Sequence, residues 1–176
     1  MQTYIELSSA LLFAGFFFTG VLAIDGLRSK ASSIDLNRYK LESFLMTTEH
    51  ENINQIIISS IFDANCHIRE HMADIIGEKK LDSARGSLLK QLEAEQNYFT
   101  VSSIIEALGK IGYYNDIQSI LNWLDKHQDK IIMEHQYFLL KHIYKALCQL
   151  DTTQNQEYVS SFYNKYAVYM NDYIVN

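Results

Sequence analysis

Apolar residues recur at steps of three and four along most of the chain after residue 35, which is the spacing of one face of an α-helix. Five successive stretches carry this stripe, starting near Ile53, Ile68, Leu81, Val101 and Ile117. No long stretch alternates apolar and polar residues as a half-buried strand would. Proline, the strongest helix breaker, is absent from all 176 residues. The pattern therefore predicts an all-α chain.

Short polar breaks divide this pattern into eight predicted helices. Asn, Asp and Thr are favoured where a helix begins and glycine where one ends. Such residues occur at 63–65, 77–79, 97, 112–115 and 151–153. The predicted helices span residues 35–47, 50–62, 66–77, 81–95, 98–111, 115–127, 132–150 and 154–172.

The predicted helices repeat in pairs. Residues 98–109 align with 137–148 at an offset of 39, with Tyr, Phe, Ile, Ala and Leu recurring in place. Residues 75–77 align with 107–109 at an offset of 32. A period in this range, with one helical hairpin per unit, is typical of an α-solenoid, in which neighbouring hairpins cover each other's apolar faces.

Two of these segments carry the motifs of a known repeat. Residues 68–77 open with Ile68-Arg69 and close with Ile75-Ile76-Gly77, and residues 107–109 read Ala-Leu-Gly. In this the chain resembles short HEAT-like repeat proteins of the phycobilisome-lyase type, over roughly residues 50 to 150. The resemblance implies a short right-handed α-solenoid of about four hairpins in residues 35–176, and a tendency to bind proteins. The chain departs from the family in lacking proline and in carrying Arg69 as its one repeat arginine.

Residues 7–24 form an uncharged apolar stretch of 18 residues. As a helix it would be about 27 Å long, close to the thickness of the hydrocarbon core of a bilayer. Only Glu6 is charged before it, whereas the basic residues Arg28, Lys30, Arg38 and Lys40 follow it. The positive-inside rule then places the N-terminus outside and the repeat domain in the cytoplasm. The prediction is a single-pass anchor in residues 1–25 and a juxtamembrane linker in residues 26–34.

Two other interpretations of the first 25 residues stay open. Val21-Leu22-Ala23 fits a signal-peptide cleavage site, which would make the rest of the chain an extracytoplasmic binding module, although a signal peptide normally begins with basic residues. The stretch could also be a buried core helix. The formal net charge of −6 and the absence of any Lys/Arg-rich run argue against nucleic acid as a partner.

Histidines suggest two forms of metal chemistry. His67 and His71 are four residues apart, with Asp74 nearby, and two histidines on one helix face are able to hold zinc. Deoxyhypusine hydroxylases, which are HEAT-repeat enzymes, hold two irons with His-Glu pairs, and Glu70-His71 stands at the matching place here. The simpler interpretation is that both histidines are solvated, because a third strong ligand is missing. We therefore predict no metal, no cofactor and no enzymatic activity, with a metal-binding enzyme as the alternative.

The last predicted helix carries an aromatic stripe. Its members recur at steps of four, four, three and four: Tyr158, Phe162, Tyr166, Tyr169 and Tyr173. One interpretation is that the stripe packs on the preceding hairpin and caps the repeats. The other is a partner-binding surface, because tyrosine is enriched at protein interfaces.

These features predict a membrane-anchored protein–protein interaction module. Residues 7–24 would contact the lipid bilayer, and the repeats would bind one or more protein partners at the membrane. Such a chain would act as a scaffold, an adaptor or an accessory subunit of a membrane complex.

Overall fold

The computed structural model describes residues 43–47, 51–150 and 156–171. Residues 43–47 are helical. The elements that follow are α3 (Glu51–Ser60), α4 (Cys66–Lys79), the 3₁₀ turn η3 (Asp82–Ala84), α5 (Arg85–Ala94), α6 (Tyr98–Ile111), α7 (Asp116–Met133), α8 (Phe138–Leu150) and α9 (Gln156–Asn171). No strand occurs in these ranges, so the all-α prediction is confirmed for the described part of the chain.

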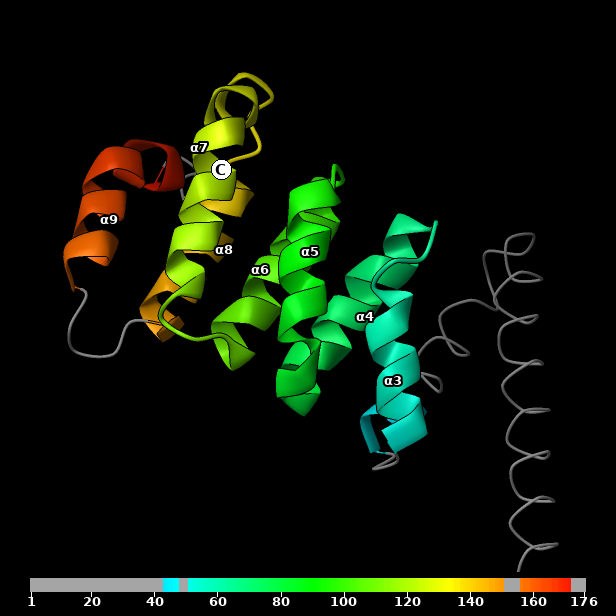
Figure 1. The fold of residues 1–176 in the computed structure, drawn as a ribbon. Helices are drawn as coiled ribbons and strands as arrows, with labels where there is room; N and C mark the ends of the chain where they lie inside the picture. The colour runs from blue at the N-terminus through cyan, green and yellow to red at the C-terminus, as the bar shows by residue number, and fades with distance from the viewer. Residues whose placement is uncertain (1–42, 48–50, 151–155, 172–176) are drawn as a thin grey trace, which may run out of the picture. The chain divides into compact units, whose positions relative to one another are not determined.

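The helices from α3 to α8 lie in two layers. Figure 1 shows α3, α5 and α7 in front of α4, α6 and α8. Within the second layer α6 packs against both α4 and α8. Between the layers, α4 contacts α3, α6 contacts α5, and α8 contacts α7. The helix α9 packs on α8. Each apolar stripe is thereby covered by neighbouring helices.

The core lies between the two layers. Its members are the stripe residues that the three- and four-residue spacing identifies. The central helix, α6, is buried on most of its surface. The largest fully buried side chains are those of Ile53, Ile57, Ile61, Ile76, Leu88, Leu92, Ile104, Ile105, Leu108, Ile117, Ile120 and Leu124.

The starts of α4 and α6 are built alike. Asn65 and Asn97 precede the two helices with nearly the same backbone angles, and the side-chain oxygen of each accepts a hydrogen bond from the second following backbone N–H. The carboxylates of Asp63 and Glu95 accept hydrogen bonds from the backbone N–H of Asn65 and Asn97, respectively. These matching N-caps recur at an offset of 32, the spacing seen in the sequence.

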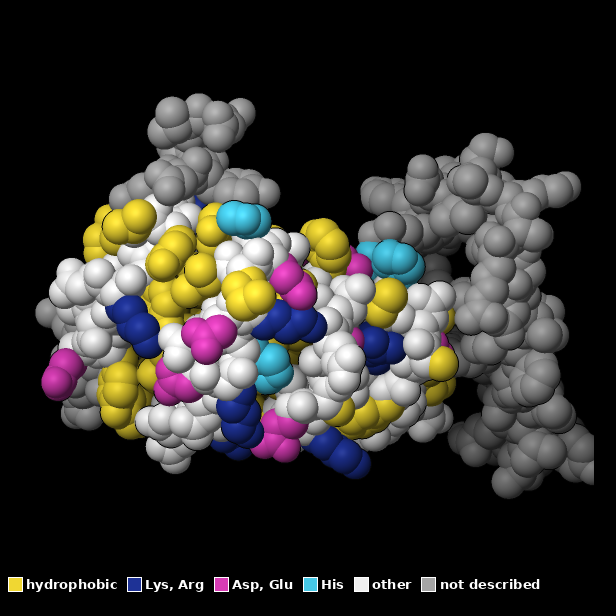
Figure 2. Space-filling model, turned by 90° about the horizontal axis from the view of Figure 1, so that it is seen from above, with side chains coloured by type: hydrophobic (Ala, Val, Ile, Leu, Met, Phe, Trp, Pro, Cys, Tyr) yellow, Lys and Arg dark blue, Asp and Glu magenta, His cyan; other side chains and the backbone are white. Residues whose placement is uncertain are grey.

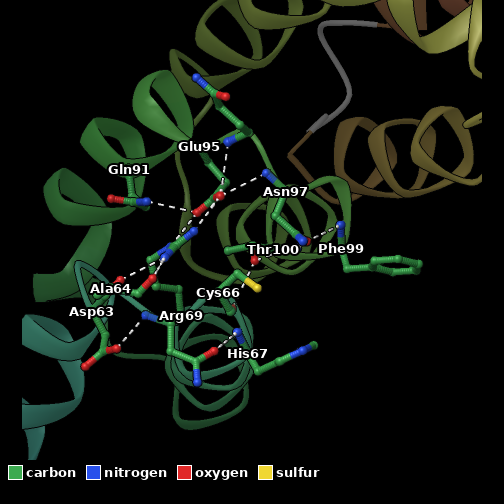
Figure 3. A network of polar contacts seen from close by, with 12 residues as sticks. Asp63, Ala64, Cys66, His67, Arg69, Gln91, Glu95, Asn97, Phe99 and Thr100 are labelled. Carbon is green, nitrogen blue, oxygen red and sulfur yellow. Dashed lines mark hydrogen bonds and ion pairs between the residues drawn. The ribbon is translucent and has the colours of Figure 1, made fainter.

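A buried ion pair ties α4 to the turn between α5 and α6 (Figure 3). The Arg69 Nε and Nη2 groups donate to the two carboxylate oxygens of Glu95 at 2.6 and 2.7 Å. The Nη1 group of Arg69 donates to the backbone carbonyls of Asp63 and Ala64, in the turn before α4. One guanidinium therefore joins two successive turns.

The Glu95 carboxylate is almost fully satisfied by hydrogen-bond donors. Besides Arg69 it accepts from the Gln91 side chain and from the backbone N–H groups of Gln96 and Asn97, at distances of 2.9 to 3.0 Å. Burial raises the pKa of Glu95, but the hydrogen bonds from Arg69, Asn97 and Gln91 outweigh it and lower this pKa to about 2. Glu95 therefore stays ionised in the interior.

Two glycines allow the helices of the second layer to approach closely. A Cβ atom on Gly77 would lie 3.0 Å from the Cα of Ala107 on α6, and one on Gly109 would lie 2.9 Å from the Cα of Ala146 on α8. Gly77 and Gly109 are 32 residues apart. At both glycines, the backbone of the neighbouring helix therefore occupies the space that a side chain would need.

Several predicted boundaries were wrong; α5, for example, starts at Arg85, after the 3₁₀ turn η3, instead of at residue 81. Three others share one physical reason. The helix α4 continues to Lys79 and α7 to Met133, and α8 starts at Phe138 instead of residue 132. Both α4 and α7 end on a non-glycine residue in the left-handed region, Lys80 (φ 52°) and His135 (φ 56°). The backbone N–H groups of these two residues and of the ones that follow bond back to carbonyls of the last turn.

Candidate partner-binding surface

One side of the second layer is not covered by the first layer and carries polar and aromatic side chains in rows. We call it the α4–α6–α8 face. The offsets of 32 and 39 relate its members from helix to helix. It consists of His67, Glu70, His71, Asp74 and Glu78 on α4, Phe99, Ser102, Ser103, Glu106 and Lys110 on α6, and Phe138, Lys141, His142, Lys145 and Gln149 on α8.

The charge of the α4–α6–α8 face changes sign from one end to the other. The helix α4 contributes the carboxylates of Glu70, Asp74 and Glu78. The helix α8 contains no acidic residue and contributes Lys141 and Lys145. The central helix α6 carries one charge of each sign on this face, so the face is acidic over α4, neutral over α6 and basic over α8.

Ion pairs link the central helix to both of its neighbours. The Glu106 carboxylate lies 2.7 Å from Nδ1 of His142 and 3.0 Å from Nζ of Lys145. On the other side, Lys110 pairs with Glu78. Burial raises the pKa of Glu106, but hydrogen bonds from Lys145 and His142 outweigh it and lower this pKa below its usual value. Glu106 is therefore ionised at neutral pH.

Asp74 lies between α4 and α6. Its carboxyl is hydrogen-bonded with Ser103, and the charges of His71, Glu70 and Glu106 act on it. Loss of surrounding water raises the pKa of Asp74 above its usual value, although the hydrogen bond with Ser103 opposes this shift. The negative charge of Asp74 is therefore less well compensated than that of Glu106.

A stacked aromatic pair, the exposed Phe99 and the half-buried Phe138, lies at one end of the α4–α6–α8 face. Phe99 leaves 60% of its surface in contact with solvent, and its ring stacks on Phe138 of the next helix at 5.2 Å. The Phe138 ring in turn contacts His142 edge-on. Aromatic side chains, phenylalanine included, are enriched at protein interfaces.

Other exposed hydrophobic side chains lie near the turns that follow α3 and α7. Phe62, in the turn after α3, has 44% of its surface exposed, and Met133, the last residue of α7, has 78% exposed. Figure 2 looks down on this end of the helices, and hydrophobic side chains are visible there in several patches between charged ones. Unlike the α4–α6–α8 face, this end has no ordered change of charge along it.

The aromatic stripe of α9 is divided between core and surface. Phe162 and Tyr166 are only 4% and 3% exposed, and the Phe162 ring stacks with Tyr144 of α8. Tyr169 is half-buried and contacts Tyr137. These three side chains pack on the preceding hairpin, so other residues of the same chain cover them. Tyr158 is exposed, and for this residue partner binding stays a prediction. Tyr173 lies outside the described residues.

We expect the replacement Tyr166→Phe to lower the free energy of unfolding by about 1 kcal/mol, because it removes one partly buried hydrogen bond. The Tyr166 hydroxyl donates to Oε1 of Gln128 on α7 at 2.8 Å. The exposed Tyr163 on the same helix offers the matched control Tyr163→Phe, for which no change is expected. Denaturant unfolding followed by fluorescence of Trp123, the chain's single tryptophan, measures the free energy of unfolding of both variants. An equal change in the two variants would contradict this packing of α9.

The two histidines proposed as zinc ligands lie on the α4–α6–α8 face. The His67 side chain is 76% exposed and lies 3.5 Å from Glu70, and His71 is half-buried near Asp74. Among the described residues, no three His, Cys, Asp or Glu side chains are grouped so that they could hold a metal ion.

The predicted membrane anchor, residues 7–24, and the linker, residues 26–34, lie outside the described residues. Within the described ranges, no helix combines the length and apolar character needed to cross a bilayer. Comparison of the chain with protein-family models, with curated proteins and with solved structures finds no match.

Apart from His67 and His71, with Glu70 and Asp74 beside them, no residue of the α4–α6–α8 face was singled out from the sequence as a candidate for binding. The missed residues include Phe99, Glu106 and Lys145. The signal that identifies them is the same repeat offset, applied to the polar positions as well as to the apolar ones: Asp74, Glu106 and Lys145 occupy one equivalent position in three successive units.

Proposed function

We propose that this chain is a membrane-anchored helical-repeat module that binds a protein partner, as a scaffold, adaptor or accessory subunit of a membrane complex. The observation that carries the proposal is the α4–α6–α8 face, where the exposed ring of Phe99, stacked on Phe138, lies beside charges ordered from acidic to basic. Stacked helical units commonly present such extended surfaces to partners. We propose no catalytic role for these residues.

The proposed architecture is a short right-handed solenoid of about four HEAT-like hairpins in residues 35–176. Three helix pairs support it: α3 with α4, α5 with α6, and α7 with α8. The matching Asn65 and Asn97 caps and the glycine contacts at the same offset of 32 also support it. The helix α9 would cover the last unit through Phe162 and Tyr166.

The proposed anchor is a transmembrane helix over residues 7–24, with the N-terminus outside and the repeats in the cytoplasm. Its length, its lack of charge and the basic residues that follow it support this orientation. An anchored module meets membrane partners at a raised effective concentration, so even a modest interface is sufficient for stable association.

The test is recovery of cross-linked partners from intact membranes that contain the full chain. Phe99→Ser removes the exposed ring from the α4–α6–α8 face, and we expect it to lower partner recovery by about tenfold, as expected for loss of an interface anchor. Met133→Ser, which removes an exposed side chain at the turn end, is the matched control and should leave recovery unchanged. Equal recovery from the Phe99 variant and the unaltered chain, both folded, would contradict the proposal.

A further inference from the structure

The turns that follow α4 and α6 lie at one end of the repeats and expose tyrosine side chains. The close contacts at Gly77 and Gly109 join the last two turns of α4, α6 and α8, so these three helices end side by side. The turns 80–84 and 112–115 and the start of α9 therefore share one end, the lower end in Figure 1. We call it the tyrosine end, because it exposes Tyr113 (60%), Tyr114 (44%) and Tyr158 (38%).

Asp116, the first residue of α7, fixes the turn that carries two of these tyrosines. Its side chain is 1% exposed and accepts hydrogen bonds from the backbone N–H of Tyr113 at 2.8 Å and from Nε and Nη2 of Arg85 at 2.7 and 2.5 Å. The Arg85 guanidinium also lies over the Tyr113 ring, 5.2 Å from its centre. An aromatic group that is already held in place loses little conformational entropy when an interface forms.

Charge contributes little to the tyrosine end. Arg85 is paired with Asp116, and Lys110 is paired with Glu78. The other charged side chains of this end among the described residues have both signs: Lys79, Lys80, Glu51, Asp82 and Glu157. A ligand of this end is therefore held by contact with the tyrosines and not by a basic patch.

The chain enters the repeats at this same end. The Nζ group of Lys79, at the end of α4, donates to the backbone carbonyl of Met46 at 3.2 Å. The stretch predicted to cross the membrane ends at residue 24, so residues 25–45, 21 in all, separate it from Met46. Such a segment reaches at most about 75 Å. It therefore keeps the tyrosine end at a high effective concentration relative to the surface of that membrane.

We infer that the tyrosine end rests on the lipid headgroups of the membrane that holds the anchor, with Tyr113 and Tyr114 at the membrane–water interface; the inference rests on the anchor of the proposed function. Tyrosine is enriched at this interface, because its ring is apolar and its hydroxyl group forms hydrogen bonds with water and headgroups. The opposite end of the repeats exposes Phe62 and Met133, but the chain does not enter there.

This placement leaves the α4–α6–α8 face open to a partner. The helices meet the membrane with their ends, so the face along their sides is directed parallel to the membrane, where other subunits of a membrane complex lie. The helix α6 has 14 residues and is about 21 Å long. Phe99, in its first turn, would therefore lie about 20 Å from the headgroups.

Fluorescence quenching in vesicles tests where the tyrosine end lies. The full chain, with Cys66→Ser and Cys148→Ser, is reconstituted into phosphatidylcholine vesicles in which some lipids of both leaflets carry a nitroxide quencher on the headgroup. A fluorophore is attached at Asn115→Cys in the tyrosine end or at Met133→Cys at the opposite end, both of which are exposed positions. We expect strong quenching at position 115 and only weak quenching at position 133. Equal quenching at the two positions, or stronger quenching at position 133, would overturn the inference.

Serine replacements show whether the tyrosines make the contact. With Tyr113→Ser and Tyr114→Ser together, quenching at position 115 should fall to the level of position 133. Tyr163→Ser, which removes an exposed tyrosine from the middle of α9, is the matched control and should leave the quenching unchanged. Circular dichroism reports whether each variant is folded. Unchanged quenching in a folded double variant would contradict the role of these two residues and overturn the inference.

Flotation of the same vesicles separates the inference from the proposed function. A chain that does not float with the vesicles would contradict the proposed anchor and the inference together. A chain that floats without quenching at position 115 would overturn the inference and leave the proposed anchor in place. A photoreactive residue at position 114 in intact membranes then identifies the occupant: lipid adducts support the inference, whereas protein adducts alone would overturn it.

Discussion

Replacing Arg69 with methionine is expected to lower the free energy of unfolding by about 3–5 kcal/mol, the usual loss when one partner of a buried ion pair is removed. Glu95 has only 2% of its side chain exposed, so its charge would lose its principal partner without gaining water. The carbonyls of Asp63 and Ala64 would also lose a donor. Equilibrium unfolding in urea measures the change.

The dependence on pH separates this mechanism from a simple loss of packing. The Glu95 pKa is lowered from 4.5 to about 2 in the folded chain, so ionised Glu95 stabilises the fold above pH 4.5 and this contribution is lost as the pH falls from 4.5 toward 2. Without Arg69 the pKa rises, so the stability difference between the chain and Arg69→Met should shrink by about 3 kcal/mol over that range. Lys126→Met, at an exposed position of α7, is the control and should stay within about 0.5 kcal/mol of the unaltered chain. A difference that is independent of pH would contradict the role assigned to Glu95.

The double replacement Gly77→Ala and Gly109→Ala is expected to destabilise the fold by about 2 kcal/mol, the middle of the overpacking cost at two sites less the gain in helix propensity. Each new methyl group would meet the backbone of the facing helix, at Ala107 and Ala146, and overpacking of this kind costs about 1–3 kcal/mol per site. The gain in helix propensity from glycine to alanine, about 1 kcal/mol per site, offsets only part of this cost. Thermal unfolding followed by circular dichroism measures the net change in stability of the double variant.

Gly86 provides the control of opposite sign. It lies in α5, and a Cβ atom placed there would have no neighbour within 4 Å. Gly86→Ala should therefore be neutral or stabilising by about 0.5 kcal/mol, because it restricts the unfolded chain without any clash. If the two close-packed sites tolerated alanine as well as Gly86 does, the close approach of α4, α6 and α8 would be contradicted.

The central helix shows how much of this fold the sequence predicts. The bounds of α6, Tyr98–Ile111, match the predicted helix at both ends, because Asn97 supplies a strong N-cap and the apolar stripe ends where Gly112 begins the turn. Gly77 was assigned to a turn, but it lies inside α4. Its local sequence resembles a helix end, and only the position of Ala107 on another helix explains why no side chain is present there.

The end of α7 was missed for a related reason. The segment 125–130 is polar and interrupts the apolar stripe, so periodicity alone ends the helix there. Ile131, which is fully buried against the core, shows that the helix continues. The turn then forms at His135, whose backbone is left-handed. Glycine at this position would have predicted that conformation, whereas histidine does not. Tertiary burial therefore set this boundary.

The candidate surface was only partly accessible to sequence reasoning. Periodicity identified an aromatic stripe on α9 but not what covers it, and the structure places Phe162 and Tyr166 against the preceding helices. The repeat offset was sufficient to align Asp74, Glu106 and Lys145. The ion pairs that join Glu106 to α8 depend on the distance between two helices, which no spacing within one helix specifies.

Position-specific photo-cross-linking in intact membranes tests most directly whether the α4–α6–α8 face binds a partner. A photoreactive residue is placed at position 99 or 145 on the face, and at position 126 on the exposed side of α7 as the control. We expect discrete protein adducts from positions 99 and 145 and none from position 126. Adducts from position 126 alone, or equal and non-specific labelling at all three positions, would contradict the assignment of this face as the binding surface.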